Sequence, residues 1–465
     1  MIEDRLTKKI LNILAGNGAD FSEVFVQKRD FNNLKLEDGK IENSTSGYEL
    51  GCGLRIWIGD STFYAFVDSL EEGKLINAAK VLSSAQSGTS SLKILDLTES
   101  NSSYRTKIKK PPRNICPDKK KDILEIIDKT SRNYSSEIIQ VTSVLSDVEE
   151  EIFIASSYGS FSYEKAVKTF LAVNAVARKG KNAASGYKSI AQTGGYEIFD
   201  LKSPKILAGN ASGIAVRMLD AVNAPTGEIP VVIGPAFGGV IFHEACGHGL
   251  EADAVMKDAS VFKGMMGKKI ASDELTAIDD STISYHWGSY KFDGEGFPSH
   301  KTVLIKDGIL ESYIYDLRTS KKMKAGQTGN GRRQSFRHVP IPRMSNTYID
   351  NGSEDPDSII KSVSKGIYAK EFAGGQVDPA TGDFVFGISE GYLIENGKLG
   401  SPIKGATLIG NGLEILKRVE AVGNNLDFAP GFCGKSGQSV SNEVGQPTIK
   451  VSRITVGGIR DKNAE

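Results

Sequence analysis

Residues 235–253 read PAFGGVIFHEACGHGLEAD and follow the short apolar segment IPVVIG at 229–234. Pro235 suits the first turn of a helix, because that position leaves its N–H unpaired anyway. His243, Glu244 and His248 then form an H-E-x-x-x-H pattern. Neutral imidazoles bind zinc, and an adjacent carboxylate can take a proton from water at the metal. The stretch therefore predicts a strand and helix that open a third structural unit and carry a zinc hydrolase site.

The spacing of the two histidines restricts the backbone. Residues five apart on a regular α-helix are turned by about 140° from each other, whereas the four-residue spacing of H-E-x-x-H leaves about 40°. A regular helix cannot bring both rings to one ion. Either a π-type turn brings residues i and i+5 onto one face, or the helix ends at Gly247 and His248 returns from a non-helical position.

A catalytic zinc site needs a third protein ligand and an open position. Spacing alone does not select that ligand from the candidates Cys246, Glu251, Asp253, His286, His300, His338 and Cys433. Cys433 lies between glycines in APGFCGKSGQ, a turn setting that can present a thiolate without crowding. A buried inert thiol, or a nucleophile paired with a histidine, explains Cys433 equally well at this point.

Outward from this stretch, the chain alternates helical and strand-like segments typical of an α+β fold. Residues 3–14, 70–84, 118–132 and 203–222 have helical periodicity, and 21–68 and 138–193 have strand-like alternation. Three Asp-Gly or Asn-Gly pairs, at 38–39, 307–308 and 396–397, predict hairpins. A polar stretch at 87–113 and a break at 224–227 divide the chain. We expect two N-terminal α+β domains, 1–110 and 111–223, and a larger β-rich C-terminal domain, 224–460.

Composition excludes several classes of function. The 465 residues contain 57 Lys and Arg against 57 Asp and Glu, so direct binding to nucleic acid is not expected. No apolar run is long enough to span a membrane, and the first residues lack the apolar core of a signal peptide. We therefore expect a cytoplasmic protein whose four cysteines form no disulfides.

Several further motifs occur in a fixed order: HEACGHGLEAD, FDGEG, TGNGRR, HVPIPRMSNTY, GGQVDPATGDFVF, YLIENGK, KGATLIGNG, GFCGKSGQS and GQPTIKV. In this order they resemble the TldD/PmbA family, and the chain is similar to its TldD-type, catalytic members. The match is dense over about 225–459 and weaker, but collinear, over the first 220 residues.

The resemblance implies a zinc-dependent peptidase that cleaves peptides or unfolded chains. Carried over by position, His243, His248 and Cys433 would be the zinc ligands, and Glu244 the general base. The resemblance also implies either a homodimer or a heterodimer with a PmbA-type (TldE) paralog. The alternatives are a non-catalytic subunit of such a complex and a cysteine hydrolase that uses Cys433.

Other polar residues have a functional and a structural interpretation. Arg332 or Arg333 could bind a peptide carboxylate, although a structural ion pair explains them as well. His338 could stabilise the oxyanion of the reaction, or could be structural. Glu251 and Asp253 could orient an imidazole, or could form a polar helix end.

Overall fold

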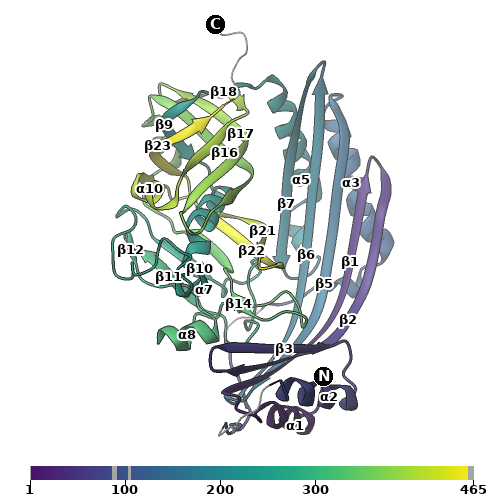
Figure 1. Cartoon of the computed structure of the whole chain (residues 1–465). Coiled ribbons are helices and arrows are strands. Elements are labelled where there is room, and N and C mark those ends of the chain that lie inside the picture. Colours follow the sequence, from purple (N-terminus) through teal and green to yellow (C-terminus); the bar gives the residue numbers. More distant parts are fainter. Residues whose placement is uncertain (1, 86–91, 103–105, 459–465) are drawn as a thin grey trace.

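The computed structural model describes residues 2–85, 92–102 and 106–458. Its N-terminal half is a long, curved, mostly antiparallel sheet in the order β3-β2-β1-β5-β6, with β7 and the short β4 also paired to β6 (Figure 1). The strands are β1 (Phe21–Glu37), β2 (Lys40–Ile58), β3 (Ser61–Val67), β4 (Thr98–Glu99), β5 (Ile138–Ser156), β6 (Ser160–Lys179) and β7 (Asn182–Thr193).

Helices cover the outer face of this sheet, because the alternating strands direct an apolar row to that side. Leu145 and Leu171 pack against Leu124 and Leu207 of the helices. The helices are α1 (Asp4–Leu14), α2 (Glu72–Ser83), α3 (Pro117–Tyr134), α4 (Ile198–Leu201) and α5 (Pro204–Arg217), with the 3₁₀ turns η1 (Pro112–Asn114) and η2 (Met218–Asp220). The expected helices and the Asp38–Gly39 hairpin are confirmed; these two turn residues have φ of 48° and 75°.

The sheet crosses the expected boundary near residue 110. Strand β1 pairs with β5 from Glu23 opposite Ser156 to Glu37 opposite Thr142. The segments on both sides of the boundary therefore share a continuous sheet, and the division into 1–110 and 111–223 stays a prediction. Residues 87–91 and 103–105 of the expected linker lie outside the described residues.

The C-terminal region contains two larger sheets. One has the order β12-β11-β10-β15-β22-β21, and the other has the order β16-β9-β23-β19-β17-β18-β8, with β20 paired to β23; β13 and β14 form a small separate pair. The strands are β8 (Val222–Asn223), β9 (Gly227–Ile233), β10 (Ala277–Asp280), β11 (Lys301–Lys306), β12 (Ile309–Leu310), β13 (Gly331–Arg332), β14 (Ile341–Pro342), β15 (Asn346–Ile349), β16 (Lys365–Val377), β17 (Asp383–Glu395), β18 (Lys398–Lys404), β19 (Thr407–Asn411), β20 (Val419–Val422), β21 (Asp427–Lys435), β22 (Gln438–Gln446) and β23 (Ile449–Gly457). The expected α+β class with a β-rich C-terminal region is confirmed.

The same region contains several short helical segments. They are η3 (Ala236–Gly239), α6 (Val240–Phe242), η4 (His243–Gly247), η5 (His248–Leu250), α7 (Ala252–Met256), α8 (Leu317–Met323), α9 (Pro356–Lys361) and α10 (Gly412–Lys417). Phe242 and Cys246 belong to the main C-terminal core, together with Ile233, Met344 and Leu416. The H-E-x-x-x-H stretch is therefore held in the interior of this region.

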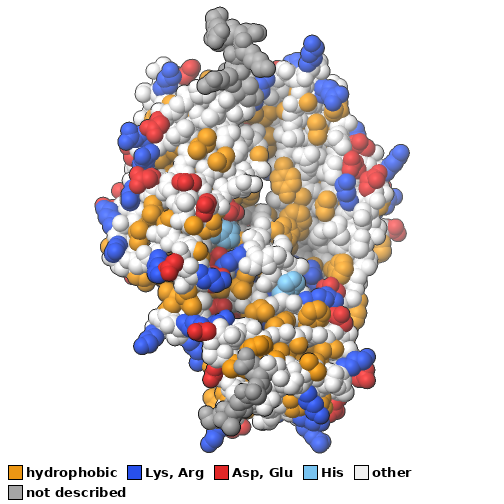
Figure 2. Space-filling model, in the orientation of Figure 1, with side chains coloured by type: hydrophobic (Ala, Val, Ile, Leu, Met, Phe, Trp, Pro, Cys, Tyr) orange, Lys and Arg blue, Asp and Glu red, His pale blue; other side chains and the backbone are white. Residues whose placement is uncertain are grey.

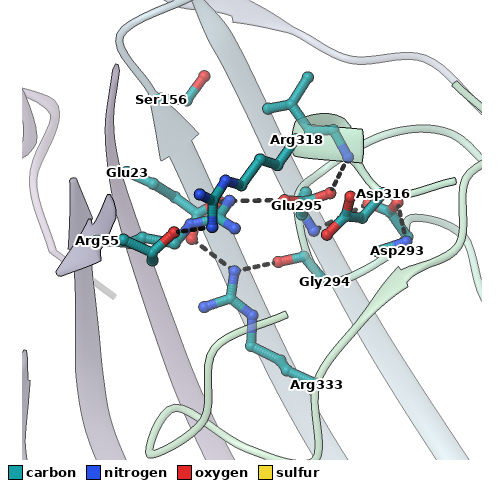
Figure 3. A network of polar contacts seen from close by, with 12 residues as sticks. Glu23, Arg55, Ser156, Asp293, Gly294, Glu295, Asp316, Arg318 and Arg333 are labelled. Atoms are coloured by element: carbon teal, nitrogen blue, oxygen red, sulfur yellow. Dashed lines mark hydrogen bonds and ion pairs between the residues drawn. The ribbon is translucent and has the colours of Figure 1, made fainter. Parts of the chain in front are cut away.

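Buried ion pairs fasten the long sheet to the C-terminal region (Figure 3). Arg55 on β2 lies 2.5 Å from Glu23 of β1 and 2.7 Å from Glu295 of the C-terminal region. Arg333 reaches Glu23 at 2.5 Å and donates to the Gly294 carbonyl at 2.6 Å. Because these side chains are almost fully buried, separating the two regions would expose their charges or leave them unpaired.

Of the helices in the described residues, none has the length and apolar character needed to cross a membrane.

Candidate metal centre

The H-E-x-x-x-H stretch forms a π-helical turn at η4, the first of the two backbone solutions expected. The His248 N–H donates to the His243 carbonyl, five residues earlier. The two imidazole rings consequently lie on one side, with centroids 5.1 Å apart and planes at 81°. A Cβ on Gly247 would lie 2.2 Å from the sulfur of the buried Met344, so the methionine side chain would have to move to admit a larger residue in this turn.

Cys433 comes to these rings from the far end of the region. It lies on β21, opposite Val440 of β22, in a hairpin that places it beside the π turn. Its Sγ is 3.5 Å from the His248 Nε2, and the donor atoms of His243, His248 and Cys433 all lie within 4.8 Å of one another. Burial alone would raise the pKa of the thiol, but the two histidines outweigh it and lower that pKa to about 4. The thiolate form that binds metals is thus favoured.

A buried carboxylate orients His248. The Nδ1 of His248 lies 3.0 Å from the Oε2 of Glu251, and the Nε2 of His248 is therefore directed at Cys433. Burial lowers the pKa of His248, but Glu251 and the thiol raise it well above its ordinary value. Lys435, two residues after Cys433, lies 2.9 Å from Glu251 and 2.6 Å from Asp253. Glu251 therefore contacts the imidazole, which is the first of the two interpretations given for it, whereas Asp253 contacts Lys435.

His243 has a partner on β22. The side-chain amide Nδ2 of Asn442 lies 3.3 Å from the His243 Nδ1. A 180° flip of that amide would place its oxygen at the same position, where it would accept a hydrogen bond from the Nδ1–H of His243. His243 would then keep Nε2 free for a metal, the arrangement usual for imidazole ligands.

The donor set fits zinc. A tetrahedral ion with Zn–S of about 2.3 Å and Zn–N of about 2.1 Å separates its sulfur and nitrogen donors by about 3.6 Å. The Cys433 and His248 donors are 3.5 Å apart. No other trio of His, Cys, Asp or Glu within the described ranges is grouped so that it could hold a metal.

Glu244 lies beside this group with its side chain 28% exposed, and its Oε2 is 3.7 Å from the His248 Nε2. His243 and Cys433 are almost completely buried, with 2% and 3% of their surface exposed. A carboxylate that borders the donors and still reaches solvent is placed to exchange protons with water.

The remaining candidate residues have other contacts. The Arg332 guanidinium donates to the carbonyls of Met344 and Ser441 at 2.5 and 2.7 Å. Arg333 is held by Glu23, as described above, and His338 Nδ1 lies 3.0 Å from the Ser335 hydroxyl. Cys246 is fully buried in the core, and burial raises the pKa of its thiol. None of these contacts involves the candidate metal ligands; the substrate roles of Arg332, Arg333 and His338 stay predictions.

Sequence reasoning missed Lys435 and Asn442. Lys435 follows Cys433 by two residues, and the strand period places both side chains on the same face, so the sequence contained this signal. Nothing in the sequence links Asn442 to His243, because their contact depends on how β22 packs against the π turn.

Models of the PmbA/TldA metallopeptidase family match the chain in order. Domain 1 matches residues 22–85, the central domain 110–219 and the C-terminal domain 226–458. The metalloprotease TldD homolog of Haemophilus influenzae is 38% identical over 462 residues, which cover 97% of this chain and 95% of that protein. The zinc metalloprotease TldD homolog of Saccharolobus solfataricus is 30% identical over 313 residues, or 66% and 70% of the two chains.

Solved structures share the fold over the whole chain. A Thermotoga maritima protein, named only as a candidate modulator of a DNA gyrase, has a TM-score of 0.81 at 19% identity and covers 98% of this chain and 100% of its own. TldE of Thermococcus kodakarensis has a TM-score of 0.76 at 21% identity, with 97% and 100% covered. From the ordered domain matches and the full-length relatives, the chain belongs to the PmbA/TldD family of metallopeptidases and is similar to the members named TldD.

Proposed function

We propose that this chain is a zinc-dependent peptidase that cleaves peptides or unfolded polypeptides. The observation that carries the proposal is the convergence of His243, His248 and Cys433 beside the partly exposed Glu244. Three donors leave a fourth position for water or substrate, as in catalytic zinc sites. The names of the metalloprotease relatives support the same activity.

Each residue of the candidate site would have its own role in the reaction. His243, His248 and Cys433 would hold zinc, which when bound acts as a Lewis acid on water and on the peptide carbonyl. Glu244 accepts a proton from the attacking water and later delivers it to the nitrogen of the leaving amine. Glu251 keeps His248 oriented, because it is buried and is itself paired with Lys435.

We also propose a cellular location and partners for the chain. We place the protein in the cytoplasm, as a homodimer or as a heterodimer with a PmbA/TldE-type paralog; the likeness of the fold to TldE is consistent with such pairing. Zero net charge argues against direct nucleic-acid binding.

A cysteine hydrolase is the second candidate, because Cys433, His248 and Glu251 also follow the order of a nucleophile, a base and an orienting carboxylate. That interpretation leaves His243 and Glu244 without a role. The non-catalytic subunit is a weaker alternative, since the complete donor set is retained.

Metal content and cleavage distinguish these candidates. We expect about one zinc per purified chain, lost in Cys433→Ala and kept in Cys246→Ala, the matched buried cysteine. Glu244→Gln should keep the metal and lose cleavage of an unfolded protein such as reduced casein, because it cannot take the proton. Full activity in zinc-loaded Glu244→Gln, or activity that survives complete removal of metal by a chelator, would contradict the proposal.

A further inference from the structure

Residues 342–344, at the end of β14, contact both of the segments that carry the candidate metal ligands. Arg343 donates to the backbone carbonyl of Cys433 on β21. Met344 lies against the π turn η4, since a Cβ on Gly247 would be 2.2 Å from its sulfur. The 342–344 segment therefore joins the strand of the thiol to the turn that holds the histidines.

The Arg343 side chain is buried although it is charged. Figure 2 shows Lys and Arg side chains around much of the outline of the molecule, where water solvates them, whereas Arg343 is 0% exposed. One terminal nitrogen of its guanidinium donates to the Cys433 carbonyl, and the other lies 3.4 Å from the carbonyl of Gln438 on β22. The guanidinium is planar and rigid, so the two contacts fix β21 and β22 relative to each other at the residue that carries the thiol.

Cys433 needs support of this kind because β21 is an edge strand. In the order of its sheet β21 comes last, and within the described residues β22 is the strand with which it pairs. A strand at the edge of a sheet lacks ladder hydrogen bonds on one side, and regions with fewer such contacts open more readily. The ladder with β22 alone would therefore restrain the Cys433 sulfur only from one side.

The carbonyl of Pro342 makes a second contact with the same strand. It accepts from the Lys435 ammonium at 3.2 Å. Lys435 also pairs with Glu251, and Glu251 contacts His248 at 3.0 Å. The 342–344 segment is thus connected to the thiol side and to the histidine side by contacts that require no metal.

The 342–344 segment is itself fixed to the sheet that contains β10. The Arg343 N–H donates to the Asn330 carbonyl at 3.0 Å, and the Asn330 side-chain amide donates to the Arg343 carbonyl at 3.0 Å and to Asp279 at 2.7 Å. Ser345 donates its N–H and its hydroxyl to Asp279, both at 2.7 Å. Asp279 is 1% exposed, so these hydrogen bonds are shielded from water. The backbone that carries Arg343 is therefore firmly held.

We propose that Arg343 is a positioning residue of the metal centre. Through the Cys433 carbonyl it holds the thiol at ligand distance from His243 and His248 before a metal binds. This inference rests on the metal site of the proposed function and adds a residue that acts through one of the ligands. Ligands held in place in this way bind a metal more tightly, because less ordering is needed on binding.

Zinc affinity and the absorption of bound cobalt test this role. The full-length chain is freed of metal with a chelator, and zinc affinity is measured by competition with a chromophoric chelator. Cobalt(II) is the second probe, because it takes the same His and Cys ligands as zinc and absorbs light. The wild-type chain should bind about one cobalt and show a thiolate-to-cobalt charge-transfer band with the visible bands of a four-coordinate ion.

Arg343→Met should lower zinc affinity about 10- to 100-fold, because the end of β21 loses both guanidinium contacts. The visible cobalt bands should weaken and the charge-transfer band should broaden, since the thiolate is no longer held in one position. Arg343→Lys keeps one donor for the Cys433 carbonyl, so its zinc affinity and cobalt spectrum should fall between those of the wild type and Arg343→Met.

Arg217→Met is the matched control for a loss of stability alone. Arg217 on α5 lies 3.0 Å from Glu390, whose side chain is fully buried. Removing this guanidinium should also lower the free energy of unfolding in urea. It should, however, leave zinc affinity within about twofold of wild type and the cobalt spectrum unchanged. A purely structural Arg343 would give the same result as this control.

Hydrogen exchange of the wild-type chain tests the role even if Arg343→Met does not fold. The amides of β21 and β22 are followed by mass spectrometry in the metal-free and in the zinc-loaded chain. If the hairpin is already held, exchange should slow less than about threefold when zinc binds. Amides that are protected only in the zinc-loaded chain would show that the metal orders the hairpin, and would overturn the proposal.

The outcomes separate this role from the proposed function. If the wild-type chain binds both ions and folded Arg343→Met equals it in affinity and spectrum, the role of Arg343 is rejected and the metallopeptidase proposal still stands. If the wild-type chain binds neither ion, the proposed metal site is rejected, and the positioning role with it.

Discussion

Lys435 joins the two segments that carry the candidate metal ligands. It belongs to the strand of Cys433, and its ammonium lies 2.6 Å from Asp253 and 2.9 Å from Glu251, both just after His248. Its side chain is 17% exposed, and Glu251 is fully buried. Because this contact does not involve a metal, it can hold Cys433 near His248 before any ion binds. Preorganisation of this kind increases affinity by reducing the cost of ordering the ligands.

Replacing Lys435 with Met should lower zinc affinity about 10- to 100-fold, because Glu251 loses its counter-charge and no longer holds His248 as firmly. The measurement is competition for zinc with a chromophoric chelator, followed by its absorbance. Lys417→Met is the control, since Lys417 is 51% exposed and its ion pair is with the surface residue Glu414. Equal zinc affinities for the two variants would show that Lys435 has no role in the site.

The π turn η4 depends on glycines in the elements packed around it. A Cβ on Gly412, the first residue of α10, would lie 2.3 Å from the Ala245 carbonyl oxygen inside the turn. That oxygen belongs to the backbone, so it cannot move aside as a flexible side chain would. The histidine geometry is therefore set by contacts between distant elements as well as by the local sequence.

Gly412→Ala should lower the free energy of unfolding by about 1–3 kcal/mol and weaken zinc binding, because the π turn must shift to admit the methyl group. Gly209→Ala provides the same substitution in α5, where a Cβ would meet nothing within 4 Å. For Gly209→Ala we expect the free energy of unfolding to rise by about 0.5–1 kcal/mol, because alanine has the better helix propensity. Urea unfolding and chelator competition measure both effects; a neutral Gly412→Ala would contradict the packing explanation.

At the scale of the whole molecule, the long sheet and the C-terminal region meet through buried charges. Figure 3 shows Arg55, Glu23, Glu295 and Arg333 at this contact. Glu164 makes a second connection, since its carboxylate accepts two backbone N–H groups of the C-terminal region. Burial raises the pKa of Glu164 to about 7, although these N–H groups act in the opposite direction.

This raised pKa predicts a pH-dependent stability. Glu164 binds its proton more tightly in the folded chain, so its contribution is complete below the unfolded pKa of 4.5 and is lost as pH rises through 7. Relative to Glu164→Gln, the wild-type chain should lose about 2–3 kcal/mol of unfolding free energy between pH 4.5 and 8. Urea unfolding at several pH values measures the slope.

Glu228→Gln is the control, because its side chain is 53% exposed. It should follow the wild-type pH dependence. If Glu164→Gln also showed the wild-type pH dependence of the unfolding free energy, protonation of Glu164 would not contribute to stability.

Local sequence patterns predicted the parts of the fold that neighbouring residues control. Asp38–Gly39 indicated its hairpin because both residues can adopt positive φ. The histidine spacing limited the backbone to two solutions, and the structure contains the π turn. The pairing of β1 with β5 had no such signal, because it joins residues more than a hundred positions apart. The division near residue 110, which was placed from composition, stays a prediction, since the sheet continues across it.

The sequence by itself determined the donor types, the H-E-x-x-x-H spacing and the strand and helix periodicities, since these depend on chemistry and on residues close along the chain. Without the family resemblance, however, it left Cys433 as one candidate among several for the third ligand. The tertiary structure decided which thiol faces the histidines and that Arg333 pairs with Glu23. These contacts arise where separate sheets pack together, and packing between distant segments is not encoded in any short stretch.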